Sequence, residues 1–293
     1  MRIGVFAPPM EENREHYDVL RIFGNGVRLM CGEKVTFTNV HDGYVDCDVA
    51  VVFGIEKYAV PTSKSRGDII RAHRSLGRNV IVIDTGYVHR DRYYMVGWNG
   101  LNGRADFNIS FHNCQDSSRA DQLGVTLQRS EHRSYKNHYL LIGQVPWDAA
   151  VQDLDHIGWL DLMARRLAAD RDRSVVFRPH PKAPPECYAG AHLQGRCRLI
   201  PPSMIDLESA CLDACQVVTQ NSNVGVDASI LGVSCYVGDP RGSMIAGLDR
   251  PLHDFGPIDV EARRAWFNAL AFKQWTVQEM AAGLPWRHLT EGR

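Results

Sequence analysis

The chain has 293 residues, of which 44% are hydrophobic and 23% charged, with 33 Lys and Arg side chains against 34 Asp and Glu. These fractions are those of ordinary globular proteins, and they exclude disordered, collagen-like and low-complexity chains. The length predicts two domains, each large enough to bury a core of its own. The formal net charge of -1 provides no global attraction to nucleic acid or membrane, so such binding needs a local patch.

Nothing in the sequence indicates secretion or membrane insertion. The apolar run at residues 3–7 ends at two prolines and is too short for a signal peptide, and no run approaches the roughly 18–20 apolar residues of a membrane span. The eight cysteines are scattered without a C-x-x-C pair. Cys211 and Cys215 could join a histidine at a metal, but buried thiols are the better interpretation. We therefore expect a cytoplasmic protein.

In the first half, short β-branched apolar runs alternate with amphipathic segments, which is the pattern of βα units on a parallel sheet. The pattern predicts a helix at residues 67–76 and strands at residues 3–7, 35–37, 49–53, 80–83 and 107–111. Residues 116–137 are polar and lack periodicity. We therefore place the end of a first Rossmann-like domain at residue 137.

The second half repeats this alternation. It predicts strands at residues 139–145, 174–177, 198–200, 217–219 and 234–237 and helices at residues 154–169, 204–214 and 223–231. These elements make a second Rossmann-like domain over residues 138–257, and residues 258–293 form a helical tail that packs back on the first domain. The expected fold class is α/β, with two Rossmann-like domains facing a central cleft. Ligands of such sheets bind at the carboxyl ends of the strands.

A rigid histidine follows the predicted strand at residues 174–177. In the segment RPHPK, two prolines hold the backbone extended and present His180 between Arg178 and Lys182. The arrangement suits a departing diphosphate, because cations neutralise the developing charge while the imidazole donates a proton. A lone histidine is more often structural, but the two flanking cations favour function.

Small polar residues follow the predicted strand at residues 217–219 and lead into a helix. Ser222 or Asn223 can cap that helix, whose N-terminus would then hold a phosphate. Asp227, one turn further, could accept hydrogen bonds from sugar hydroxyls. The alternative is ordinary helix capping with a solvated Asp227. Gly143, after another strand, would let a ligand approach the backbone, although an ordinary turn explains it equally well.

The order of the motifs GQ…D, RPHP, QNSNVGVDASILG and a strand ending in GD resembles the donor-binding half of GT-B glycosyltransferases. The likeness is to the capsule polysaccharide biosynthesis type and to bacterial sialyltransferases with a His-Pro motif, and it covers residues 139–240 well and the rest loosely. It implies that His180 contacts the nucleotide phosphate and assists its departure. It also implies that Ser222 and Asn223 hold phosphate. Together with the other residues of these strand ends, the expected donor-binding residues are Gly143, Gln144, Arg178, Lys182, Gln220, Asn221, Ser222, Asn223 and Asp227.

The first domain would then supply the acceptor site and the general base. Residues 80–90, VIVIDTGYVHR, resemble that family's acidic-acidic-Gly motif, with Asp84 in the first acidic position and Thr85 in place of the second. Asp84 is the candidate base, with Asp91 and Asp106 behind it, because a carboxylate can take the proton of an acceptor hydroxyl. The alternative role of Asp84 is a turn cap.

Residues 97–106 are dense in Gly and Asn around a Trp, a composition that presents backbone groups to a ligand. The expected acceptor-binding residues are Asn25, Arg90, Trp98, Asn99 and Arg104. No dinucleotide fingerprint and no paired-Asp metal motif occur. We therefore expect no cofactor and no metal, with a nucleotide-sugar of UDP or CMP type as co-substrate and Asp84 and His180 as catalytic residues.

Between residues 57 and 104, nine Lys and Arg face three acids, and Tyr87, Tyr93, Tyr94 and Trp98 lie among them. Cations interleaved with aromatic rings can follow a phosphate backbone and stack on bases, and a target base would leave its stack to reach a cleft. The chain also resembles short GT-B-like proteins of bacteriophages. The favoured acceptor is therefore a 5-hydroxymethylpyrimidine in double-stranded phage DNA. The alternatives are a capsule or lipopolysaccharide acceptor, a nucleotide-sugar epimerase and a non-catalytic nucleic-acid-binding protein.

Overall fold

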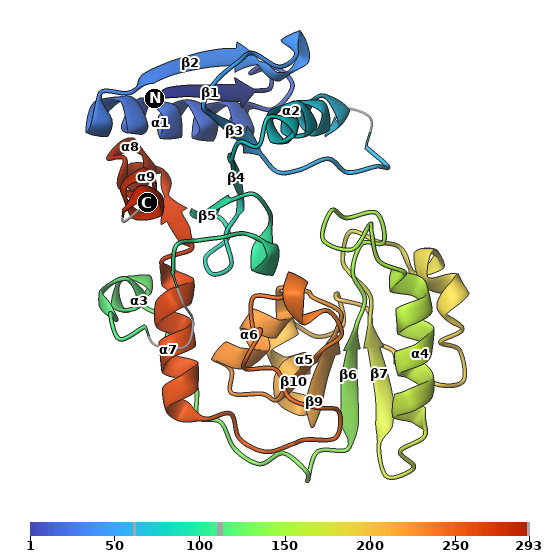
Figure 1. The fold of residues 1–293 in the computed structure, drawn as a ribbon. Helices are drawn as coiled ribbons and strands as arrows, with labels where there is room; N and C mark the ends of the chain where they lie inside the picture. The colour runs from blue at the N-terminus through green and yellow to red at the C-terminus, as the bar shows by residue number, and fades with distance from the viewer. Residues whose placement is uncertain (61–62, 110–113, 292–293) are drawn as a thin grey trace. The chain divides into compact units, whose positions relative to one another are not determined.

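The computed structural model describes residues 1–60, 63–109 and 114–291. The chain forms two compact units, Met1–Ser110 with Ala269–Arg293, and Phe111–Asn268 (Figure 1). The sequence placed the divisions after residues 137 and 257 instead. The polar segment before residue 137 lies with the second unit because it bonds there: the Gln128 N–H donates to the Ile230 carbonyl at 2.9 Å and the Ser130 hydroxyl to that of Gly232 at 2.8 Å.

The first unit contains a six-stranded sheet in the order β11-β5-β4-β3-β1-β2. Its strands are β1 (Arg2–Ala7), β2 (Lys34–Asn39), β3 (Val49–Phe53), β4 (Val80–Thr85), β5 (Tyr93–Trp98) and β11 (Gln274–Thr276). The first four are parallel, as predicted, whereas β5 and β11 were not predicted and pair antiparallel. The predicted strand at 107–111 is wrong for residues 107–109, which are irregular, and its last two residues lie outside the described part.

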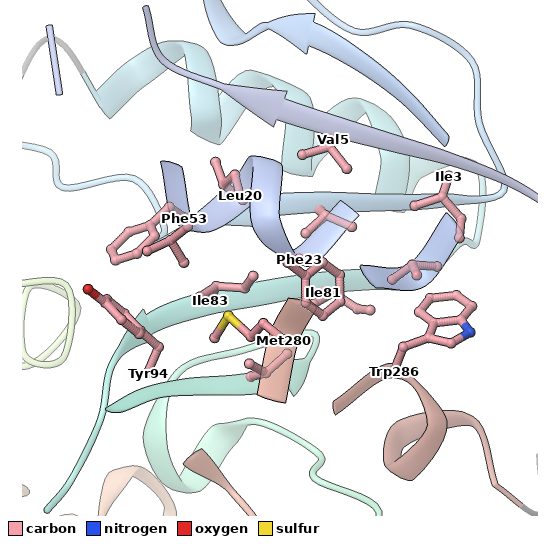
Figure 2. Close-up of a cluster of buried hydrophobic side chains, with 14 of the residues drawn as sticks. Ile3, Val5, Leu20, Phe23, Phe53, Ile81, Ile83, Tyr94, Met280 and Trp286 are labelled. Atoms are coloured by element: carbon pink, nitrogen blue, oxygen red, sulfur yellow. The ribbon is translucent and has the colours of Figure 1, made fainter. Parts of the chain in front are cut away.

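Four helices cover this sheet: α1 (Arg14–Cys31), α2 (Lys64–Ser75), α8 (Val277–Ala281) and α9 (Leu284–Thr290). The Asn13 side chain caps α1, and the helix ends at Gly32 in the left-handed conformation, with φ of 65°. Figure 2 shows the core between the sheet and helices α1, α8 and α9, where Leu20 and Phe23 of α1 meet strand residues and Met280. Burial of these apolar side chains is the main source of the unit's stability.

Two glycines let other elements approach α1 closely. A Cβ on Gly24 would lie 2.7 Å from the Phe37 ring, and a Cβ on Gly26 would lie 1.9 Å from the Met280 carbonyl oxygen. Asn25 stands between them, and its Oδ1 accepts a 3.0 Å hydrogen bond from Arg28. The segment Gly24-Asn25-Gly26 therefore serves helix packing within the first unit.

The second unit contains a fully parallel five-stranded sheet in the order β10-β9-β6-β7-β8. Its strands are β6 (His138–Ile142), β7 (Ser174–Arg178), β8 (Arg198–Leu199), β9 (Gln216–Thr219) and β10 (Cys235–Val237). Its helices are α3 (Ser118–Leu123), α4 (His156–Ala168), α5 (Leu207–Asp213), α6 (Val224–Ile230) and α7 (Val260–Ala271), which continues into the first unit. Short 3-10 turns occur at Val40–Asp42, Asn102–Arg104, Pro185–Ala191 and Pro240–Gly242. All five predicted strands of this half are present.

No helix of the described chain has the length and apolar character that crossing a bilayer requires.

The close approach at Gly26 makes a testable prediction. Gly26→Ala should destabilise the protein by about 3 kcal/mol, because the new methyl group meets a backbone oxygen that cannot rotate away. Asn25→Ala is the matched control on the same helix turn and should change stability by less than about 0.5 kcal/mol. Urea unfolding measures both, and equal midpoints for the two variants would contradict the packing described.

Candidate functional site

The carboxyl ends of the parallel strands in the second unit bring together most of the residues that the sequence singled out there. Gly143 follows β6, and its N–H donates to the Arg178 carbonyl at the end of β7 at 2.9 Å. A Cβ on Gly143 would lie 2.9 Å from the Phe177 ring and 3.0 Å from the Tyr188 ring. Gly143 therefore permits two rings to pack against the strand end.

The side chains of Gln144 and Asn221 bind each other. Gln144 Nε2 donates to Asn221 Oδ1 at 2.8 Å, and Gln144 Oε1 accepts the Asn221 backbone N–H at 3.1 Å. The remaining amide of Asn221 donates to the Ala150 carbonyl and to Asp239 Oδ2, both at 2.9 Å. Both side chains are buried, so their polar groups are directed at the protein.

His156, which the sequence analysis missed, extends this network. Its Nε2 accepts the Gln144 backbone N–H at 3.0 Å, so its Nδ1 carries the proton and donates to Gln220 Oε1 at 2.7 Å. Burial lowers the pKa of His156, in keeping with this neutral form. Gln220 is therefore also bonded within the unit. In the sequence, His156 is marked only by its place near the start of a predicted helix, and that place does not distinguish a buried histidine from one at the surface.

His180 lies just after β7 and is partly exposed. Its backbone N–H donates to the Tyr188 hydroxyl at 3.1 Å, and its Nδ1 accepts the Lys182 backbone N–H at 3.0 Å. Since Nδ1 accepts, the proton of the neutral ring is on Nε2. The Lys182 side chain is exposed. The hydrogen bond from Lys182 thus holds the imidazole in a defined orientation.

Arg178 is buried, and Nη1 donates to the Ile205 carbonyl at 2.8 Å. Among the described residues it forms no salt bridge, although a buried guanidinium normally pairs with a carboxylate. It lines a pocket of about 220 Å³ on one face of β6, β7 and β8. The other lining residues are His138, Leu140, Val176, Arg198, Ile200, Met204, Ile205, Ala210 and Asp213. A mostly apolar pocket with an unpaired buried cation is suited to a planar ligand with an anionic or carbonyl edge.

The start of α6 completes this edge of the sheet. The Ser222 backbone N–H donates to Thr219 Oγ1 at 3.1 Å, and its hydroxyl accepts the Val224 N–H at 3.3 Å. Asn223, at the cap position, makes no side-chain cap hydrogen bond. Ser222, Asn223 and Asp227 are each partly exposed, although Asn223 Oδ1 itself is buried.

In the first unit, Asp84 ends β4 beside an arginine. Asp84 Oδ1 accepts the Thr85 N–H at 2.7 Å. A Cβ on Gly54 would lie 3.4 Å from Asp84 Oδ2 and 3.2 Å from Arg66 Nη1, so both groups flank this glycine. Burial lowers the pKa of Arg66, and the Asp84 carboxylate opposes that shift. Arg66, which we did not single out from the sequence, therefore accompanies the candidate base.

Two histidines lie at the same edge of the first sheet. The His16 ring stacks on Phe53, with 3.7 Å between ring centroids, and burial, with smaller contributions from Arg66 and Lys57, lowers its pKa to about 4. His41 Nε2 lies 2.6 Å from Glu12 Oε2, and its Nδ1 lies 3.0 Å from the Ser65 hydroxyl. Neither histidine stood out in the sequence, because no motif surrounds them.

The Gly- and Asn-rich loop lies at the opposite end of strand β4 from Asp84. Asn99 and Val80 exchange hydrogen bonds of 2.7 and 2.9 Å at the first residue of β4, whereas Asp84 is near its last. Trp98 is buried and donates to the Leu289 carbonyl at 3.2 Å. Arg104 and Asp106 belong to the same loop. Of the remaining predicted residues, Arg90 and Asp91 are exposed in the turn that follows β4, on the side of Asp84.

The basic segment at residues 57–104 is largely paired within the protein. Five of its nine cations bind other groups of the described chain. Arg66 donates to the Phe53 carbonyl and Arg74 to the Asn99 carbonyl. Three more pair with acids: Arg71 with Glu56 and Asp68, Arg78 with Asp46, and Arg92 with Asp91. Of its five aromatic side chains, Tyr87, Tyr94 and Trp98 are buried, whereas Tyr58 is 65% exposed. The cations and rings therefore do not form one exposed row, because three of the rings lie in the core while Arg71 and Arg92 pair with acids at the surface.

The described residues contain no group of three or more His, Cys, Asp and Glu side chains placed to hold a metal ion. Cys211 and Cys215 are both buried, and burial raises the pKa of Cys211 to about 12 and that of Cys215 to about 11. Both thiols therefore stay protonated at neutral pH.

No protein-family model and no curated protein match the chain. Among solved structures it is similar to two Thermosulfurimonas dismutans KpsC structures, a β-Kdo 2,4 transferase at 12% identity and a β-Kdo 2,7 transferase at 16%. Each aligns over 97% of this chain and 98% of its own, with a TM-score of 0.54. These likenesses confirm the predicted fold class: the chain is an α/β protein with GT-B-like, Rossmann-type units.

The environment of His16 predicts a pH dependence of stability. The pKa of His16 is about 4 in the folded protein and 6.5 in the unfolded chain. Between pH 6.5 and 4 the unfolded chain therefore binds more protons than the folded protein, and the free energy of unfolding falls as the pH is lowered through this range. His16→Gln should reduce the loss of unfolding free energy between pH 6.5 and 4 by about 1–3 kcal/mol. Urea unfolding at several pH values measures it, and an unchanged pH dependence would refute the assignment.

Proposed function

We propose that the protein transfers a sugar from a nucleotide-sugar donor to a hydroxyl acceptor. The observation that carries the proposal is His180, whose ring orientation is fixed at the carboxyl end of β7 with its proton on Nε2. In transfer, the acceptor oxygen bonds to the anomeric carbon while the bond from that carbon to the leaving phosphate breaks. The Nε2–H of His180 would stabilise the charge that develops on the departing phosphate.

The second unit is the donor-binding part in this proposal. The pocket beside Arg178 would receive the polar edge of the nucleotide, because its guanidinium supplies donors that no carboxylate of the described chain satisfies. Ser222 and Asn223 would contact phosphate, and Asp227 would accept from sugar hydroxyls. Gln144 and Asn221 would hold the two loops in place and not bind the donor directly, since each is bonded to the other.

The first unit contributes the base. Asp84 would take the proton of the acceptor hydroxyl, with Arg66 beside it favouring the ionised carboxylate. His16 and His41 lie on the same side of the sheet, which supports an acceptor site there. Asn25, Trp98 and Asn99 are engaged in packing or in backbone bonds, as described above.

For the acceptor we propose a glycan hydroxyl, with a hydroxymethylated base in DNA as the second candidate. DNA binding depends on free cations that replace counterions along the phosphates. Five arginines of the basic segment already bind other groups of the chain and three of its five aromatic rings are buried, which favours the glycan over DNA. The protein is incubated with CMP- and UDP-sugars and either a hydroxymethylated DNA duplex or an oligosaccharide. Mass spectrometry then shows which of the two acceptors has gained the mass of a sugar.

His180→Ala should lower the rate of transfer at least about 100-fold and leave nucleotide affinity nearly unchanged, because the imidazole acts as the bond breaks. His132→Ala, which removes an exposed histidine of the same unit, is the control and should transfer sugar at the wild-type rate. Nucleotide release in the presence and absence of acceptor measures the reaction. Full activity of the His180 variant would exclude the assigned role, and acceptor-independent turnover would indicate an epimerase instead.

Arg178→Met should weaken nucleotide binding at least about tenfold, because it removes the cation of the pocket. The same change should leave the melting temperature of the unliganded protein equal or higher, since a buried charge without a salt-bridge partner is removed. Calorimetric titration with CMP and UDP, together with thermal unfolding, gives both values. Undiminished binding would show that the pocket is not part of the donor site.

A further inference from the structure

The Tyr188 hydroxyl connects two loops at the proposed donor site. It accepts the His180 backbone N–H at 3.1 Å and donates to the Gln144 carbonyl at 2.9 Å. The side chain is only 2% exposed, and its ring packs edge-to-face on Phe177 with centroids 5.1 Å apart. The hydroxyl thus joins the loop after β7 to the loop after β6 away from solvent.

Gln144 is fixed on its other side by His156. The Gln144 N–H donates to His156 Nε2, and its side chain holds Asn221. Because Gln144 is bonded at its N–H, its carbonyl and both side-chain atoms, its loop is strongly determined. Tyr188 transmits that position to His180, because its hydroxyl binds both the Gln144 carbonyl and the His180 backbone N–H.

We propose that Tyr188 is the positioning residue for His180, and that His156 fixes the Gln144 loop on which Tyr188 depends. The proposal rests on the proposed role of His180 in sugar transfer. A catalytic imidazole displaced by about 1 Å can lose a factor of about 100 in rate, so a hydroxyl that fixes its backbone affects catalysis without touching substrate. Tyr188 has no role in the resemblance to known families.

A second buried tyrosine supplies the matched control. Tyr139, also in the second unit, donates its hydroxyl to Asp170 Oδ2 at 2.6 Å and lies 2.6 Å from His253 Nδ1. Tyr139 is the second residue of β6, at the end of the strand far from Gln144. Tyr188→Phe and Tyr139→Phe therefore each delete a buried hydroxyl with two hydrogen bonds, and only the first deletion reaches His180.

The first measurement uses the unliganded protein and needs no reaction. Long-range proton–nitrogen NMR should show the Nδ1–H tautomer for His156 and the Nε2–H tautomer for His180 in the wild type. In Tyr188→Phe the His180 amide should exchange with solvent at least about tenfold faster and the tautomer should become mixed. Tyr139→Phe should leave both signals unchanged. An unaltered His180 in Tyr188→Phe, or the same change in both variants, overturns the proposal.

The second measurement is kinetic. Tyr188→Phe should lower kcat about tenfold or more with an unchanged KM for the donor, and Tyr139→Phe should change neither, whatever stability it loses. In a His180→Ala background, Tyr188→Phe should have no further effect on kcat. A full additional loss there would show that Tyr188 acts independently of His180. Absence of transfer by the wild type would defeat the proposed function, while the NMR result would still decide whether Tyr188 positions His180.

Discussion

The buried amide pair of Gln144 and Asn221 is the contact on which the functional edge of the second unit depends. Each amide is both donor and acceptor, and together they join the ends of β6 and β9 through two hydrogen bonds. A buried amide left unpaired costs about 1–3 kcal/mol, so only the strand register that brings the two together is stable. Asp239 and His156 satisfy the remaining groups, which extends the constraint to β10 and α4.

The two amides and His156 are uncharged, and their polar groups are directed at one another and at Asp239, which leaves ligand binding to other residues. His180, Arg178 and Ser222 differ in this respect. The first is held by its backbone, the second lines a pocket without a salt bridge in the described chain, and the third is partly exposed at the start of α6. A rigid frame with hydrogen-bond donors at its margin keeps these donors oriented without reorganisation, as the proposed binding of a leaving phosphate requires.

The sequence predicted most of the parallel strands well because β1, β3, β4, β6, β7 and β9 are short, mainly apolar runs that are largely buried. It missed β5 and β11, since YYMVGW and QWT resemble an aromatic loop and a helical tail until their antiparallel pairing is known. At the site, the RPHP segment was informative because proline restricts the backbone locally. His156 and Tyr188 were not found, since their function arises from hydrogen bonds to residues 12 and 8 positions away, respectively, with no local signature.

The basic segment of the first unit shows why a charge count along the chain differs from a surface potential. Arg71 and Arg78 pair with acids, Glu56 and Asp46, that lie just outside residues 57–104, so the counted excess is offset by neighbours that the fold brings in. What remains functional is set by the sheet. The parallel strands β1, β3 and β4 end on one side of the sheet, where Asp84 and Arg66 flank Gly54, and under the proposed function the acceptor hydroxyl would give its proton to Asp84 there. The Gly- and Asn-rich loop, bonded to the first residue of β4, is separated from it by the length of the strand.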